Sequence, residues 1–179
     1  MGSSVGASMG QTGLNSGMQR LIAALGCCAG IMAITFVYEW AWSLAYLPMI
    51  GAALGSLTRT KQAVLAGFGM GIAAGALFTF IGTQAQRNSD PGTFEIIVGV
   101  LGAFWLPFQI SILARFTENH PTLDALIIRS TLCTLLALLF LLFGTFLREA
   151  FGLWSPMGLG SGAYVYGIAP LFLPASQLK

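Results

Sequence analysis

The stretch from Leu21 to Thr58 carries one charged side chain, Glu39, in an otherwise apolar run. A continuous helix of this length would be about 57 Å long, nearly twice the roughly 30 Å thickness of a bilayer's hydrocarbon core. The run is therefore too long for one transmembrane span and about long enough for two. An ionised carboxylate prefers water, and the neighbouring Tyr38 and Trp40 are typical of the membrane interface. We therefore predict a helical hairpin whose tight connection contains Glu39.

The composition extends this conclusion to the whole chain of 179 residues. Charged residues make up 8% of the sequence and hydrophobic residues 56%, and the mean hydropathy is +0.80. Eight Lys and Arg and six Asp and Glu side chains cannot cover the surface of a soluble domain of this size. The sequence therefore predicts an all-α integral membrane protein in contact with membrane lipids. No nucleic-acid partner is expected, because the net charge of +2 comes from scattered residues rather than a clustered basic face.

Three further apolar stretches are each about one span long: Gln62–Gly82, Phe94–Ala114 and Ala125–Leu147. The last apolar segment, Leu153–Pro174, is uncharged, but its many Gly and Pro residues make it a poor helix. A re-entrant or interfacial segment is the alternative to a span there. We expect a compact bundle of about six transmembrane helices, or five if this last segment does not span.

The domain organisation follows from the same pattern. The first 19 residues are rich in Gly and Ser and carry no charge, which predicts a flexible N-terminal arm. Residues 20–179 are expected to form a single transmembrane helical domain.

Basic residues in the loops predict the orientation. With six spans, one side of the membrane receives five basic residues and the other receives two; these are Arg20, Arg59, Lys61, Arg115 and Lys179 against Arg87 and Arg148. The positive-inside rule then places both termini in the cytoplasm. If the first apolar run were one span, the charges would be mixed almost evenly, so the hairpin is favoured.

Glycines recur at helical spacing in three of the spans. Gly67, Gly71 and Gly75 are four residues apart, with Gly82 seven residues further on, so all lie on one helical stripe. Such a stripe lets another backbone approach closely, which is how helices associate in lipid. The predicted helix-packing positions are Gly26, Gly30, Gly51, Gly55, Gly67, Gly71, Gly75 and Gly82. They serve either packing inside one bundle or docking of a partner subunit.

Three polar side chains at or near membrane depth form the candidate polar site. Gln109 lies two residues after Pro107, and a proline inside a helix leaves a backbone carbonyl one turn earlier without its hydrogen bond. The side-chain amide of Gln109 could therefore form hydrogen bonds with the helix or with a ligand. Arg129 lies about one turn inside its span and either snorkels to the surface or faces a polar path. Glu39 caps the hairpin, or, if the first span is longer, needs a cationic partner such as Arg129.

Most Trp and Tyr residues fall near the expected span ends, as in an interfacial aromatic belt. These residues are Trp40, Trp42, Tyr46, Trp154, Tyr164 and Tyr166. Trp105 and many Phe lie deeper, where contact with a pigment, a quinone or lipid fits them equally well.

The sequence offers few residues that could hold a haem, a metal ion or a nucleotide. The single histidine, His120, excludes a bis-histidine haem held by this chain alone. The sequence contains no HExxH or Walker motif. The three cysteines, Cys27, Cys28 and Cys133, lie in apolar runs and are expected to be buried hydrophobic side chains. No haem, metal or nucleotide site is therefore predicted, the cofactor is left unknown, and the chain is not expected to be an enzyme.

The segment LTRTKQAVLAGFGMGIAAG, residues 57–75, joins a basic turn to a glycine-rich helix. It resembles the second-to-third helix region of the substrate-binding subunits of energy-coupling-factor vitamin transporters, which are similar in size and in a six-helix layout with both termini inside. The resemblance implies a solute-transport component and carries over no binding residue.

Two functional hypotheses follow. The glycine stripes, the few interior polar residues and the small loops favour a small non-catalytic subunit that packs with other membrane subunits or with copies of itself. The alternative is a transport component, with Gln109, Thr79 and Arg129 lining a path. Transport predicts that these polar groups converge on one cavity, whereas a structural subunit predicts that they scatter or pack against other helices.

Overall fold

The computed structural model describes residues 16–38, 41–87, 89, 92–118, 120–151 and 156–173. Within these ranges the chain forms helices and turns and no strand. In chain order the α-helices are α1 (Ser16–Val37), α2 (Trp42–Leu57), α3 (Lys61–Gln86), α4 (Thr93–Leu113), α5 (Leu123–Phe151) and α6 (Pro156–Ile168). Two short 3-10 helices, η2 (Ala114–Phe116) and η3 (Ala169–Leu171), extend α4 and α6.

Four of the helices are long and apolar enough to cross a membrane: α1, α3, α4 extended by η2, and α5. The prediction of an all-helical bundle of membrane type is thus confirmed for the described residues. α2 has 16 residues and α6 has 13, so both are shorter than the four long helices.

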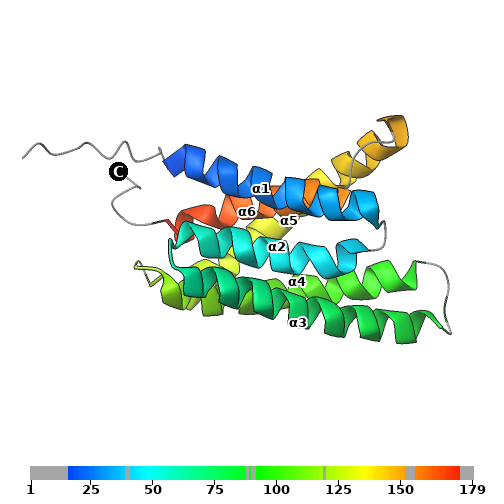
Figure 1. Ribbon diagram of the computed structural model, residues 1–179, viewed down its shortest axis with the longest axis horizontal. Coiled ribbons are helices and arrows are strands. Elements are labelled where there is room, and N and C mark those ends of the chain that lie inside the picture. The colour runs from blue at the N-terminus through cyan, green and yellow to red at the C-terminus, as the bar shows by residue number, and fades with distance from the viewer. Residues whose placement is uncertain are drawn as a thin grey trace, which may run out of the picture.

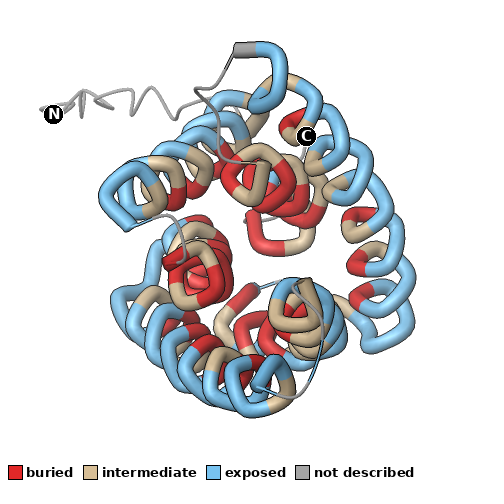
Figure 2. Tube along the Cα trace, turned by 90° about the vertical axis from the view of Figure 1, so that its right-hand side faces the viewer, coloured by how far each residue is buried: buried red, intermediate tan, exposed pale blue. Residues whose placement is uncertain are grey.

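The helices run back and forth along the long axis of the molecule, so that α1 begins at the end of the bundle where α6 finishes (Figure 1). α2 is the central helix and contacts α1, α3, α4 and α6, whereas α5 packs mainly on α6. Viewed end-on, buried residues face the inside of the ring of helices and exposed residues lie on its outside (Figure 2). The core is therefore shared by all six helices around α2.

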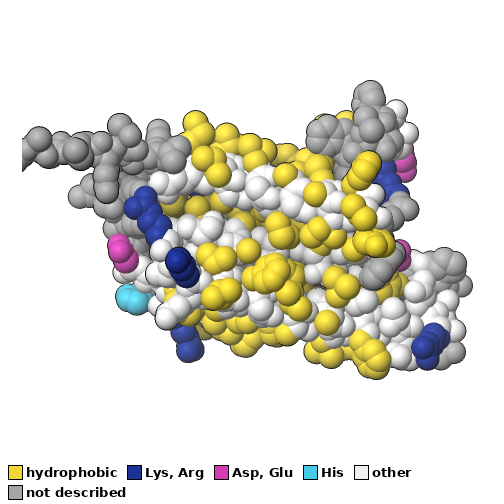
Figure 3. Space-filling model, in the orientation of Figure 1, with side chains coloured by type: hydrophobic (Ala, Val, Ile, Leu, Met, Phe, Trp, Pro, Cys, Tyr) yellow, Lys and Arg dark blue, Asp and Glu magenta, His cyan; other side chains and the backbone are white. Residues whose placement is uncertain are grey.

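Charged side chains gather at the two ends of the bundle, with hydrophobic side chains over the region between them (Figure 3). At one end, Arg59 lies in the turn from α2 to α3 and Lys61 begins α3; at the other end, Arg87 caps α3. A charge in hydrocarbon is costly, whereas an apolar band in lipid is favourable. This distribution is the one expected of a bundle that lies across a bilayer.

The first and last helices differ in extent from the prediction. α1 begins at Ser16, so residues 16–19, expected in the arm, are helical. Residues 1–15 lie outside the described part of the chain, as do Glu39 and Trp40, so the predicted arm and the hairpin connection are not described there.

α6 is helical although its glycines have low intrinsic helix propensity. Pro156 stands at the first helical position, where a missing N–H costs no hydrogen bond. A Cβ added to Gly158 or Gly162 would lie 3.1 Å from a carbonyl oxygen of α1, and one added to Gly160 would lie 3.0 Å from the Ala137 oxygen of α5. The close approach of two neighbouring helices offsets the low intrinsic helix propensity of glycine.

The aromatic-belt prediction is wrong for two tyrosines. Tyr46 is 5% exposed and Tyr164 1% exposed, and both belong to the core. The Tyr46 hydroxyl donates a hydrogen bond to the Val98 carbonyl (3.0 Å), and the Tyr164 hydroxyl lies 2.8 Å from the Ser130 hydroxyl. A buried tyrosine is tolerated where its hydroxyl has such a partner. Trp154 lies outside the described residues.

Candidate functional site

The glycine stripe of α3 faces α2 of the same chain. A Cβ on Gly67 would overlap the carbonyl oxygen of Gly51, and one on Gly71 would overlap the backbone at Pro48. A Cβ on Gly75 would lie 3.3 Å from the Ser43 oxygen. The stripe therefore serves a backbone-to-backbone contact inside the bundle, and its face is not open to a partner subunit.

The remaining packing glycines have different neighbours. Gly51 and Gly55 form the α2 side of the same contact, with a Cβ on Gly55 lying 2.6 Å from the Ala63 oxygen of α3. Gly82 faces α4, and Gly30 faces the side chain of Met49. Gly26 is the exception, because no atom lies within 4 Å of a Cβ built there. Seven of the eight predicted positions therefore meet another helix of this chain, and Gly26 borders open space.

Gln109 sits where α2, α3 and α4 meet and is fully buried. Its amide nitrogen, Nε2, donates to the Leu47 oxygen of α2 (3.2 Å) and to the Gly67 oxygen of α3 (3.0 Å). Its Oε1 has no hydrogen-bond partner among the described residues. The amide therefore joins three helices at their closest approach instead of serving the carbonyl that Pro107 frees in its own helix.

Three other side-chain hydrogen bonds, buried or part-buried, join different pairs of helices. Thr79 of α3 donates to the Ser43 hydroxyl of α2 (3.2 Å). The Tyr46 bond joins α2 to α4, and the hydroxyl pair of Ser130 and Tyr164 joins α5 to α6. Sequence reasoning missed the Tyr46 bond and the Ser130–Tyr164 pair, although a hydroxyl inside an apolar run is a signal that a partner is required.

Arg129 and Arg20 meet the C-terminal end of α6 from opposite sides. Arg129 of α5 donates from Nε to the Gly167 oxygen (3.1 Å), and Arg20 of α1 donates from Nη2 to the Tyr166 oxygen (3.3 Å). The Arg20 guanidinium carbon also lies 4.4 Å from the centre of the Tyr166 ring. The last carbonyls of a helix lack partners within the helix and carry partial negative charge. The two arginines therefore cap α6, and Arg129 uses its Nε here rather than on a solute path.

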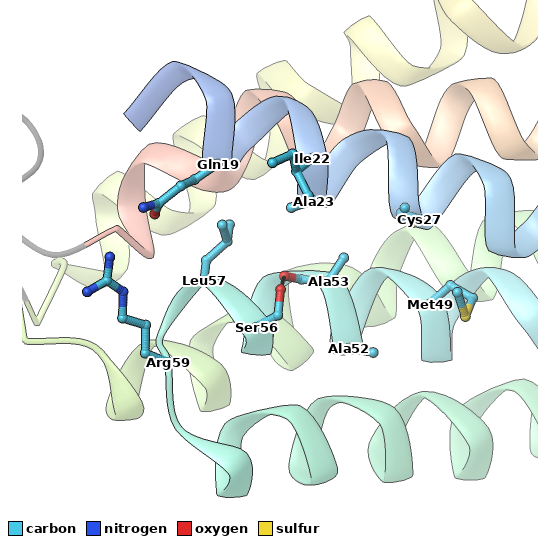
Figure 4. A pocket seen from close by; sticks show the side chains of 11 residues that line it. Gln19, Ile22, Ala23, Cys27, Met49, Ala52, Ala53, Ser56, Leu57 and Arg59 are labelled. Atoms are coloured by element: carbon cyan, nitrogen blue, oxygen red, sulfur yellow. Dashed lines mark hydrogen bonds between the residues drawn. The ribbon is translucent and has the colours of Figure 1, made fainter. Parts of the chain in front are cut away.

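An open groove of about 480 Å³ lies between α1 and α2. Gln19 and Arg59 lie at one end of it, and Cys27 and Met49 lie at the other, with small and apolar side chains between (Figure 4). Gln109, Thr79 and Arg129 do not line this groove. Its lining suits an apolar occupant with a polar end and offers no acid–base pair.

Within the described residues, no group of three His, Cys, Asp or Glu side chains is placed to hold a metal ion. In comparisons with known proteins, no family model, no curated protein and no solved structure matches the chain. The resemblance to substrate-binding subunits of vitamin transporters therefore gains no support from them, and the function rests on the geometry.

Proposed function

We propose that this chain is a small, non-catalytic, multi-pass membrane subunit that packs within a larger membrane assembly or a homo-oligomer. The observation that carries the proposal is the dispersal of the interior polar groups. Gln109, Thr79 and Arg129 each bond to a neighbouring helix, at three different contacts, instead of converging on one cavity. A transport path would need at least some of these groups to face a common space, so the transport alternative loses its candidate residues.

The bundle crosses the membrane six times in this proposal. α2 is about 24 Å long, and α6 with η3 about 26 Å, a few ångströms short of a typical hydrocarbon core. Both run beside longer helices and connect opposite ends of the molecule (Figure 1). A modest mismatch of this size is accommodated by local thinning of the bilayer. The five-to-two division of loop charges then places both termini in the cytoplasm.

A partner is expected on α5 rather than on the glycine stripe. α5 is the least buried of the four long helices, because it packs mainly against α6 alone. Its outward side chains include Leu132, Leu139 and Phe146, each more than 60% exposed. Exposed apolar side chains are ordinary where a helix contacts lipid, so exposure alone does not indicate a partner. A partner is expected on α5 because one side of this helix contacts no other helix along most of its length.

Site-specific photo-crosslinking in native membranes tests the proposal. A photoreactive residue at Leu139, which is 64% exposed, should give adducts with the mass of another protein chain. The matched control is Leu65, which is 71% exposed on α3 and should give lipid adducts only. Lipid adducts at both positions, together with a single-chain mass after mild-detergent extraction, would rule out the subunit proposal.

A further inference from the structure

With the bundle across a bilayer as proposed, the groove between α1 and α2 spans one leaflet. It runs from Gln19 to Cys27 along α1, and from Leu57 to Met49 along α2. Eight residues of helix on each side correspond to about 12 Å. This length is slightly less than half of the roughly 30 Å hydrocarbon core. The groove therefore reaches from the charged end of the bundle to near the middle of the membrane.

The lining of the groove leaves room for an apolar chain that enters from the side. The groove holds about 480 Å³, and the small side chains of Ala23, Ala52 and Ala53 line its middle. The absent side chain at Gly26 leaves room inside, since nothing lies within 4 Å of its Cβ position. Ile22 on the rim is 52% exposed, so the groove opens sideways to the surrounding lipid. An acyl chain can enter by that side without crossing the core of the bundle.

The outer end of the groove carries a cation. Arg59, in the turn between α2 and α3, is exposed, and its side chain points towards Gln19 across the mouth (Figure 4). A guanidinium and an amide are hydrogen-bond donors that match a phosphate. Arg20, the basic residue of α1, is held on α6 by its bond to the Tyr166 oxygen. Arg59 is thus the basic residue that faces an occupant of the groove.

We propose that this groove binds one anionic phospholipid, with an acyl chain between α1 and α2 and the headgroup phosphate at Arg59. The site presupposes the proposed placement of the bundle in a membrane. In the proposed orientation, Arg59 faces the cytoplasmic leaflet, where anionic lipids produce a negative surface potential.

Native mass spectrometry of the full chain, purified with phosphatidylglycerol and phosphatidylcholine in equal amounts, tests the charge at the mouth. The wild type should retain one phosphatidylglycerol per chain in preference to phosphatidylcholine. Arg59→Gln should weaken retention about five-fold, the contribution of one basic residue near an anionic surface. Lys61→Gln removes the same charge two residues away, outside the groove, and should change retention little. Equal losses in the two variants would mean diffuse surface charge and would overturn the site.

A second pair of variants tests the acyl-chain contact. Gly26→Leu fills the groove without meeting another atom at its Cβ, so the protein should fold normally and lose the retained lipid. Gly69→Leu makes the same change at an open, exposed position on α3 and should keep the lipid. Unchanged retention in Gly26→Leu overturns the site. Vesicle flotation separates the two proposals: a wild type that floats without lipid preference refutes only this site, whereas one that fails to enter vesicles refutes the membrane subunit itself.

Discussion

Replacing Gly67 by Ala tests the contact between α2 and α3 most directly. The added methyl group would overlap the carbonyl oxygen of Gly51, which is part of the α2 backbone. A backbone atom cannot rotate away as the end of a flexible side chain can. The two helices must therefore separate locally, and the separation would also lengthen the bond from Gln109 to the Gly67 oxygen, now 3.0 Å long.

The size of the effect follows from three contributions. Overpacking a tight contact costs typically about 1–3 kcal/mol. Loss of one interhelical hydrogen bond in a membrane costs about 0.6 kcal/mol. Alanine in a helix interior is more favourable than glycine by about 0.5–1 kcal/mol, which partly offsets the loss. Gly67→Ala should therefore lower the free energy of unfolding by about 1–3 kcal/mol.

Gly69→Ala is the matched control in the same helix. No atom lies within 4 Å of a Cβ at Gly69, so only the favourable helix propensity remains. The two variants should differ by roughly 1.5–3.5 kcal/mol, with opposite signs relative to the wild type. Equilibrium unfolding by SDS in mixed micelles, followed by circular dichroism, measures this difference. If both variants were equally stabilised, α2 and α3 would not be in contact at Gly67 and the arrangement described above would be incorrect.

Three other predictions follow from the buried bonds and the loop charges. Gln109→Leu should fold and lose about 1 kcal/mol in the same unfolding assay, because two interhelical bonds of about 0.6 kcal/mol are removed. Tyr164→Phe should cost about 1–3 kcal/mol, since it leaves the buried Ser130 hydroxyl without its partner, and adding Ser130→Ala should restore part of that loss in a double-mutant cycle. In a variant without native cysteines, Ser89→Cys should react with an impermeant maleimide only from outside the cell, and Thr60→Cys only after the cytoplasmic side is opened; the reverse pattern would invert the proposed orientation.

The helix class and the approximate positions of the helices could be predicted from the sequence because they depend on local properties. Apolar runs of about 20 residues separated by charged turns indicate helices in lipid, whatever their neighbours. The spacing of Gly67, Gly71 and Gly75 likewise fixes one face of one helix. The spacing carries no information on which helix covers that face, so only the three-dimensional arrangement distinguishes internal packing from a partner.

For the candidate polar site, too, the sequence does not indicate which distant residues a side chain contacts. Gln109 attracts notice because an amide is rare inside an apolar run, but its two acceptors lie 62 and 42 residues away in the chain. No local pattern connects an amide to backbone carbonyls on distant helices. The groove between α1 and α2 could not be predicted either, because it depends on how far apart two helices stand. α6 was the weakest prediction, since the close contacts that stabilise its glycines are with helices far from it in sequence.

The position of α6 has a consequence for the order in which the protein assembles. α6 is the last of the described α-helices to leave the ribosome, yet it packs between α1 and α5, which are completed earlier. Until it inserts, the α1 and α5 backbones at Ala24 and Ala137 lack the glycine contacts that cover them, and Arg20 and Arg129 lack their carbonyl acceptors. Before α6 packs, the first five helices form an incomplete bundle. The side that α6 will cover is lined by small residues and by two arginines. Packing of α6 closes that side, so a chain that ended before α6 would leave Arg20 and Arg129 without these acceptors and the backbones at Ala24 and Ala137 uncovered.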